Sequence, residues 1–223
     1  FGQLRGLCEP GKSVLLTAPT VVEGIVVSDY RSPNMELNPN LNYFSVDLEE
    51  NDRTAYVEAA DGSAGIRLRF DEASENRLAR YDRVRLDLNA CRLTRTASPD
   101  CMTLTGVQAL NVLSVAPGTA ADLPLKERTV ATLTDDDIYT YCALSGLEFS
   151  VKEGAYTNVR EYDAIGNPCN EGIAFPGSAQ AQKAKDGAAN LLYDGDNDAI
   201  YMLVNMNCGW RRTGQSVPQG VGT

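Results

Sequence analysis

The chain has 223 residues, which is enough for one large domain or two small ones with a real hydrophobic core. Its 20 Lys and Arg residues stand against 30 Asp and Glu residues, and the resulting formal net charge of −10 opposes the binding of DNA or anionic lipid over the whole surface. The chain has no histidine, which excludes Ser-His-Asp and Cys-His catalysis, histidine-ligated zinc and an imidazole pH switch.

The first predicted element is a strand over residues 20–29. This run is rich in β-branched residues, and its internal Gly24 indicates a bend or a bulge. Residues 30–48 follow, with two prolines, four asparagines and little apolar periodicity. We expect them to form a long loop between strands, and long loops often carry function.

A β-hairpin is predicted next, with strands over 54–60 and 66–70. Strict alternation in the second strand places every other residue on one face. The Asp61-Gly62-Ser63 sequence between the two runs is a strong hairpin-turn signal. Residues 71–81 are polar, and we expect a short helix or an ordered loop there.

Two further strands are predicted over 83–93 and 102–113. The apolar residues of 83–89 alternate regularly, whereas those of 102–113 change phase around Gly106. A β-bulge explains such a change of phase. Strand, hairpin, short helix or loop, and two more strands are the count and order of a five-stranded barrel that binds oligonucleotides or oligosaccharides, an OB-like barrel. A small β-sandwich is the alternative.

We therefore expect an all-β dominated chain with the barrel domain over 11–118. The Pro-, Gly- and Ala-rich stretch 116–126 marks the boundary, and a smaller α+β or β segment follows over 127–223. In that segment Thr134 and Asp137 fit a capping box that opens a short helix. Strands are expected in this segment at 141–151, 190–193 and 199–205. A long loop is expected at 163–187.

Six cysteines are spread along the chain without a C-x-x-C pair, so neither redox chemistry nor a zinc site is indicated. Free buried thiols and disulfides both remain open. Cys91 and Cys101 flank a polar turn at 96–100 and are the first disulfide candidate. The longest uncharged stretch, 101–121, contains several polar residues and a Pro-Gly break, so no membrane span is predicted.

A basic stretch over 67–95 offers one candidate ligand-binding surface. It holds eight arginines and five acids within an acidic chain, and Arg67, Arg69, Arg85 and Tyr56 are its candidate ligand-binding residues. The more ordinary alternative is a solvated sheet face with cross-strand pairs of arginine and acid. A single-strand binder also needs stacking aromatic residues, and few occur here.

Aromatic residues near the C-terminus offer a second candidate surface. Trp210 and Tyr201 could stack on a sugar or anchor a protein, although a lone tryptophan is more often packed in a core. Asp194, Asp196 and Asp198 alternate as in a calcium loop, but the loop lacks the required Gly and Glu, which favours a tight turn between two strands. We expect no cofactor and no metal beyond this weak calcium candidate.

Three segments, 22–29, 54–70 and 81–88, resemble the OB-fold-like domain of unknown function in Bacteroides-type cell-envelope lipoproteins. The resemblance covers about the first 115 residues, with weaker similarity at 141–149 and 186–192. It implies an exported, lipid-anchored parent protein and no catalytic residues. Because the chain begins at Phe1 without a leader, we expect a fragment whose targeting segment precedes it and whose last residues, 217–223, approach a further domain.

The expected function is that of a non-catalytic binding or structural module of the cell envelope, periplasmic or surface-exposed, with a glycan or a protein as ligand. One alternative is a single-stranded nucleic-acid-binding module that serves a nuclease domain, although nucleic acid is the less favoured ligand. The other is a carboxylate-based hydrolase, for which the acidic run Asp47, Glu49, Glu50 and Asp52 would supply the acids.

Overall fold

The structure is a computed structural model that describes residues 1–33, 48–149, 187–196, 198–205 and 222. The chain divides into two compact units. The first unit comprises Phe1–Pro33, Asp52–Glu127 and Leu133–Ala143, and the second comprises the remaining residues. None of the described helices has the length and hydropathy needed to cross a lipid bilayer.

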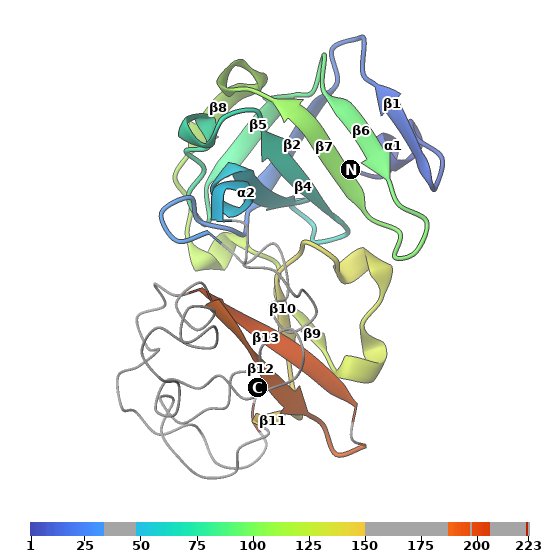
Figure 1. The fold of residues 1–223 in the computed structure, drawn as a ribbon, viewed down its shortest axis with the longest axis vertical. Coiled ribbons are helices and arrows are strands. Elements are labelled where there is room, and N and C mark those ends of the chain that lie inside the picture. Colours follow the sequence, from blue (N-terminus) through green and yellow to red (C-terminus); the bar gives the residue numbers. More distant parts are fainter. Residues whose placement is uncertain (34–47, 150–186, 197, 206–221, 223) are drawn as a thin grey trace, which may run out of the picture. The chain divides into compact units, whose positions relative to one another are not determined.

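The first unit contains an eight-stranded mixed sheet (Figure 1). In chain order its strands are β1 (Lys12–Leu15), β2 (Val21–Val26), β3 (Thr54–Glu58), β4 (Gly65–Phe70), β5 (Arg83–Asp87), β6 (Arg92–Arg95), β7 (Met102–Val107) and β8 (Val112–Ala116). Their order in the sheet is β1-β6-β7-β4-β3-β2-β5-β8. The β4–β7 pair is parallel, and every other neighbouring pair is antiparallel.

The expectation of a chain dominated by β-structure is confirmed, but the closed five-stranded barrel is not. The sheet has eight strands, and β1 and β8 form its two ends. The strand predicted over 83–93 is divided into β5 and β6, because Ala90 between them adopts a left-handed φ of 67° that an extended strand cannot hold. The strand predicted over 102–113 likewise ends at Val107, and β8 begins after a short 3-10 turn.

Helices are short and few in the described part of the chain. The α-helices are α1 (Gly2–Arg5) and α2 (Leu48–Arg53), and the 3-10 turns are η1 (Ala73–Glu75), η2 (Ala109–Asn111), η3 (Ala120–Asp122), η4 (Val130–Thr132) and η5 (Asp135–Asp137). The helix or loop predicted over 71–81 is the single turn η1 within ordered coil. At η5 the Asp137 carboxylate accepts the Thr134 N–H, as the predicted capping pair requires.

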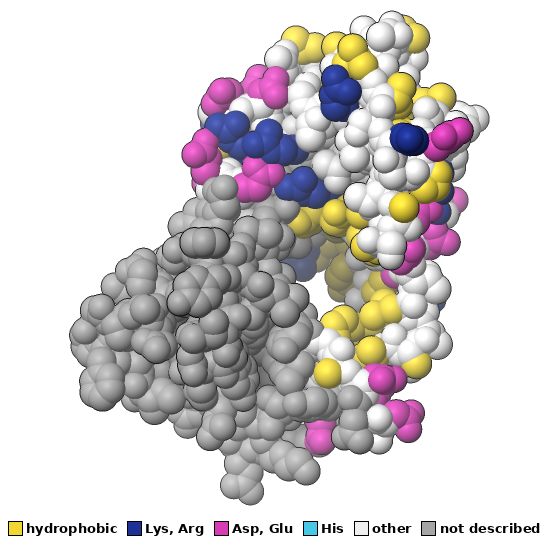
Figure 2. Space-filling model, turned by 45° about the vertical axis from the view of Figure 1, so that its right-hand side comes forward, with side chains coloured by type: hydrophobic (Ala, Val, Ile, Leu, Met, Phe, Trp, Pro, Cys, Tyr) yellow, Lys and Arg dark blue, Asp and Glu magenta, His cyan; other side chains and the backbone are white. Residues whose placement is uncertain are grey.

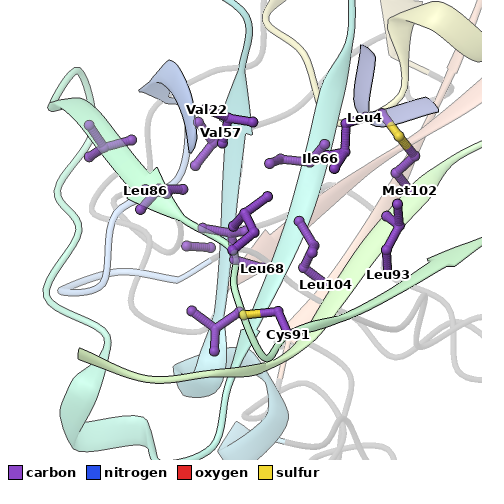
Figure 3. Packing of buried hydrophobic residues seen from close by; sticks show 14 of the residues in the cluster. Leu4, Val22, Val57, Ile66, Leu68, Leu86, Cys91, Leu93, Met102 and Leu104 are labelled. Carbon is purple, nitrogen blue, oxygen red and sulfur yellow. The ribbon is translucent and has the colours of Figure 1, made fainter. Parts of the chain in front are cut away.

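The core follows from the alternation read in the sequence. Every second residue of β4 (Ile66, Leu68 and Phe70) is fully buried. Aliphatic side chains from β2, β3, β5, β6 and β7 and from α1 pack against them (Figure 3). The intervening residues of these strands therefore lie on the opposite face of the sheet, which is where a binding surface can form.

The predicted bulge at Gly106 is confirmed. Leu68 pairs with Leu104 and Phe70 pairs with Val107, so one residue of β4 lies opposite two residues of β7. Gly106 has a φ of 75°, a conformation that glycine adopts without a Cβ clash. The extra residue returns Val107 to the core face, where it is fully buried.

The second unit contains a three-stranded sheet in the order β11-β12-β13. Its strands are β11 (Glu148–Phe149), β12 (Gly187–Tyr193) and β13 (Ala199–Asn205), which places strands where the sequence predicted them at 190–193 and 199–205. A separate two-stranded sheet pairs β9 (Lys126–Arg128) with β10 (Cys142–Leu144).

Candidate ligand-binding face of the sheet

A row of polar side chains crosses the first unit's sheet on the face opposite the core. The strand register places Tyr56 beside Arg67, and Arg67 beside Thr103. The row continues through Thr94 to Ser13, whose hydroxyl groups lie 2.8 Å apart. Three hydroxyl groups, one guanidinium and one phenol ring are thus aligned across β3, β4, β7, β6 and β1.

Arg67 and Arg69 both belong to this outer face. Arg69 lies opposite Thr54 in the register, and Arg67 Nη2 donates to the Thr54 Oγ1 atom at 3.5 Å. Both arginines are half-buried, whereas Thr54 is buried. Two predicted ligand-binding arginines and Tyr56 are therefore brought together on two adjacent strands.

The segment Leu133–Ala143, which we call the strap, folds back onto this same face. Its Tyr139 ring stacks on the Tyr56 ring with centroids 5.0 Å apart and planes inclined by 8°. The Cys101 thiol lies 3.8 Å from the Tyr139 hydroxyl group and is oriented to donate to it. Burial and the neighbouring Cys101 raise the pKa of Tyr139 to about 12, so the phenol is neutral at physiological pH.

Gly65 allows the strap to approach the sheet closely. A Cβ atom at Gly65 would lie within 3.0 Å of the backbone carbonyls of Ile138 and Tyr139. Tyr139 itself has a φ of 62°, a left-handed conformation that is costly for a residue with a side chain. The backbone of the strap is therefore pressed against β4 at a point that only glycine permits.

Glu58 of β3 holds the strap through a buried hydrogen bond. This side chain is fully buried, and its Oε2 atom accepts the Tyr141 N–H at 2.7 Å. Burial raises the pKa of Glu58, although the Tyr141 hydrogen bond and the Lys126 charge oppose the rise. Its Oε1 atom is buried and has no hydrogen-bond partner among the described residues. Because Glu58 does not reach solvent, its role is to hold the strap rather than to contact a ligand.

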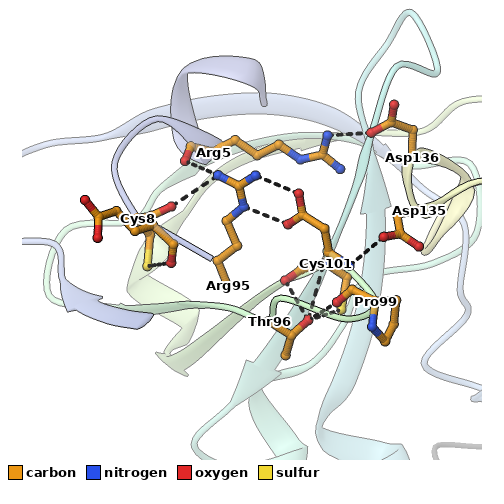
Figure 4. A network of polar contacts seen from close by, with 10 residues as sticks. Arg5, Cys8, Arg95, Thr96, Pro99, Cys101, Asp135 and Asp136 are labelled. Carbon is orange, nitrogen blue, oxygen red and sulfur yellow. Dashed lines mark hydrogen bonds and ion pairs between the residues drawn. The ribbon is translucent and has the colours of Figure 1, made fainter. Parts of the chain in front are cut away.

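The three consecutive acids of the strap bind different parts of the unit. Asp135 accepts the backbone N–H of Asp100 at 2.8 Å, and Asp136 forms an ion pair with Arg5. Figure 4 shows both contacts beside the Arg95 guanidinium. Asp137 pairs with Lys126 Nζ at 2.8 Å, and both side chains are largely buried. The strap thus combines ionic contacts with one aromatic stack.

The other predicted arginine, Arg85, does not join this surface. It lies on β5, which β2 and β3 separate from β4 in the sheet order. It lies directly opposite Glu23 of the neighbouring strand β2, and the two side chains form an ion pair at 3.3 Å. The cross-strand pairing considered for the basic stretch is therefore confirmed for Arg85. Figure 2 likewise shows basic and acidic side chains interspersed on the face that it draws.

The predicted disulfide between Cys91 and Cys101 is wrong, because both cysteines are free thiols. Cys91 precedes Arg92, which pairs with Thr105, whereas Cys101 precedes Met102, which pairs with Arg95. The two thiols therefore lie at opposite ends of the β6–β7 hairpin. Burial raises the pKa of the Cys91 thiol to about 11, which keeps it protonated.

The aspartate run at 194–198 forms the tight turn between β12 and β13. Asp194 Oδ1 accepts the backbone N–H groups of Asp196 and Asp198, each at 2.9 Å. Tyr193 pairs with Ala199 at the base of this hairpin. Within the described residues no three acids, cysteines or histidines gather as metal ligands.

The remaining candidates are only partly described. Trp210 and Asp47 lie outside the described residues, as does most of the loop predicted over 30–48. Tyr201 is described through its backbone, in β13 opposite Leu191. Of the other acids in the run, Glu49, Glu50 and Asp52 belong to α2.

Sequence reasoning missed Tyr139, Thr103 and Glu58. The alternation of β3 places Glu58 and Tyr56 on one face, so Glu58 could have been found from its spacing. Thr103 required the β4–β7 register, and Tyr139 required the return of a distant segment, for which the sequence carries no local signal. Comparisons with protein-family models, curated proteins and solved structures gave no match.

Proposed function

We propose that the protein is a non-catalytic binding module that takes a glycan carrying an acidic sugar on the outer face of β3, β4 and β7. The observation that carries this proposal is the aligned row of Tyr56, Arg67 and Thr103. A phenol ring can stack on the apolar face of a sugar. A guanidinium group binds a carboxylate through two parallel hydrogen bonds, and a threonine hydroxyl group matches the hydroxyl groups of a sugar.

Charge favours a short glycan over a nucleic acid. A nucleic acid brings a phosphate at every nucleotide to a chain whose net charge is −10. Several arginines that would bind phosphates are engaged within the protein: Arg83 pairs with Asp122, Arg85 with Glu23 and Arg95 with Asp100. An oligosaccharide with one carboxylate brings only one negative charge, so the net charge of −10 opposes it less.

We also propose that the sheet closes in the manner of an OB-like barrel. The parallel β4–β7 pair supports this, as does the stretch 83–95, which pairs with β2 through β5 and with β7 through β6. Between β5 and β6 the Leu88 N–H donates to the Thr20 carbonyl at 2.9 Å, and the Ala90 N–H donates to the Leu16 carbonyl at 2.7 Å. Slow hydrogen exchange at Leu88 and Ala90, comparable to that within β5, would support a continuous bent strand, and fast exchange would contradict it.

The proposed location is the cell envelope, in an exported and lipid-anchored parent protein. The segments 22–29, 54–70 and 81–88, which resemble envelope lipoprotein domains, support this. Metabolic labelling of the parent protein with a fatty acid, followed by protease treatment of intact cells, tests it. A parent protein that takes up no label and fractionates with cytoplasmic markers would contradict the proposal.

Two pairs of matched sugars test the ligand by calorimetric titration. 3′-Sialyllactose and a glucuronate-substituted xylotriose each carry one carboxylate, whereas lactose and xylotriose are their neutral counterparts. We expect each acidic sugar to bind at least about tenfold more tightly than its neutral counterpart, since a charged hydrogen bond is worth about 1.5–3 kcal/mol. Arg67→Ala should remove this preference, and Arg85→Ala, a matched arginine on β5, should keep it.

Other outcomes identify the alternatives. Tight binding of a thymidine 15-mer with a steep salt dependence that Arg67→Glu abolishes would replace the glycan by a single-stranded nucleic acid. Release of reducing sugar during the titration would make the protein a hydrolase. Equal binding of acidic and neutral sugars would contradict the role of Arg67.

A further inference from the structure

The strap places an aromatic ring on the sheet where the proposed function places a sugar ring of the ligand. Its Tyr139 presents a flat ring to Tyr56, and its three consecutive aspartates bring carboxylates to basic and N–H groups of the first unit. The partners of these aspartates lie outside the row of Tyr56, Arg67 and Thr103, so the ring of Tyr139 is the group of the strap that takes a ligand's place on Tyr56. It also lies on the row that the proposed function assigns to the ligand.

Two of the contacts that hold the strap lie at the surface, whereas the Glu58–Tyr141 hydrogen bond and the Asp137–Lys126 ion pair are buried and must also break before the strap is released. The Arg5–Asp136 ion pair is solvent-exposed, and so is the hydrogen bond from the Asp100 N–H to Asp135. Exposed ionic contacts of this type are weak and are screened by salt. Tyr139 occupies its position with a left-handed backbone, which opposes docking.

We propose that the strap Leu133–Ala143 is an autoinhibitory cover, in which the Tyr139 ring occupies the place on Tyr56 that a sugar ring of the ligand takes. This inference rests on the proposed function. A ligand reaches Tyr56 and the adjoining edge of Arg67 only when the strap leaves the sheet. The dissociation constant of the intact protein then equals that of the open face divided by the fraction of molecules in which the strap is released.

Two substitutions of Tyr139 distinguish the effect of its ring from the effects of its backbone conformation and its hydroxyl group. Tyr139→Asn removes the ring, and asparagine tolerates a left-handed φ better than most residues. Tyr139→Phe keeps the ring and the stack and removes only the hydroxyl group, so it serves as the matched control. Hydrogen exchange at the Tyr141 N–H, which Glu58 accepts in the docked state, reports strap release without any ligand.

The full chain and both variants are titrated with 3′-sialyllactose and lactose while Tyr141 exchange is measured in parallel. We expect Tyr139→Asn to exchange faster and to bind 3′-sialyllactose at least about tenfold more tightly, and Tyr139→Phe to match the wild type. Adding Arg67→Ala to Tyr139→Asn should abolish the gain. If Tyr139→Asn fails to fold, Gly65→Ala, whose Cβ would displace the strap backbone, takes its place under the same criteria.

These measurements distinguish a failure of the autoinhibitory role from a failure of the proposed function. If the wild type binds the acidic sugar and the faster-exchanging Tyr139→Asn binds it no more tightly, the strap is not a cover, and the proposed function stands. If neither protein binds either acidic sugar although Tyr141 exchanges faster in the variant, the proposed function fails and the autoinhibitory role fails with it.

Discussion

The Tyr139 ring stacks on the Tyr56 ring, with centroids 5.0 Å apart and planes inclined by 8°, although the two residues lie 83 positions apart in the chain. An aromatic pair contributes about 0.5–1.5 kcal/mol beyond its buried area. The left-handed backbone of Tyr139 costs about 1–2 kcal/mol. The two terms nearly cancel, so the stack alone does not hold the strap, and the polar contacts of Glu58 and the strap aspartates decide whether it docks.

Gly65→Ala should loosen the strap and lower the free energy of unfolding by about 1–3 kcal/mol, the usual cost of forcing atoms into a packed site. The reason is that the new Cβ would meet the carbonyl groups of Ile138 and Tyr139. Denaturant unfolding monitored by circular dichroism measures the loss. Gly2→Ala is the control, since nothing lies within 4 Å of a Cβ there. An unchanged unfolding free energy in Gly65→Ala would show that the strap does not rest on β4.

Glu58→Gln should become more stable relative to the wild type as the pH rises. Burial raises the pKa of Glu58 in the folded protein above its usual value of 4.5. Its stabilising contribution is therefore complete below pH 4.5 and is lost as the pH rises through the folded-state pKa, where the buried carboxyl must ionise. Glutamine does not titrate. Melting temperatures of both proteins between pH 4 and pH 8 measure the difference, and a difference that does not vary with pH would contradict the prediction.

Asp100→Asn should show the opposite pH dependence. Two Arg95 hydrogen bonds, of 2.7 and 2.6 Å, lower the pKa of Asp100 below its usual value of 3.8. The same Arg95 also donates to the carbonyl groups of Arg5 and Cys8 and so connects α1 to β6 (Figure 4). The variant should melt below the wild type at pH 7, and the difference should shrink as the pH falls below 3.8 and Asp100 becomes protonated. Equal melting temperatures at pH 7 would show that this pair contributes nothing.

Native thiol labelling should modify Cys101 well before Cys91. Cys101 is partly exposed, whereas Cys91 is buried with a pKa of about 11, so only about one Cys91 thiol in a thousand is ionised at pH 8. Mass spectrometry after brief treatment with iodoacetamide measures the order, and denatured protein, in which both thiols are accessible, is the control. Non-reducing peptide mapping should yield no linked Cys91–Cys101 peptide, and finding one would overturn the β6–β7 register.

Much of the sheet could be predicted from the sequence because the signals are local. The period of two in 66–70 identifies the core face of β4, and Asp61-Gly62 places the β3–β4 turn. The change of phase at Gly106 identifies the bulge, and the aspartates at 194–198 identify the turn before β13. Each of these features depends on residues within a few positions of one another, so composition and spacing determine them.

Other features were decided only by tertiary structure. The division of 83–95 into β5 and β6 depends on the segment 16–20, whose backbone forms hydrogen bonds with the backbone of residues 88–91. The separation of Cys91 from Cys101 depends on the register of their hairpin, which a sequence with two flanking cysteines does not specify. The candidate site depends on both kinds of information. Alternation places Tyr56 and Arg67 on the outer face, but the position of Tyr139 over them follows from contacts between residues far apart in the chain, whose energies no local pattern encodes.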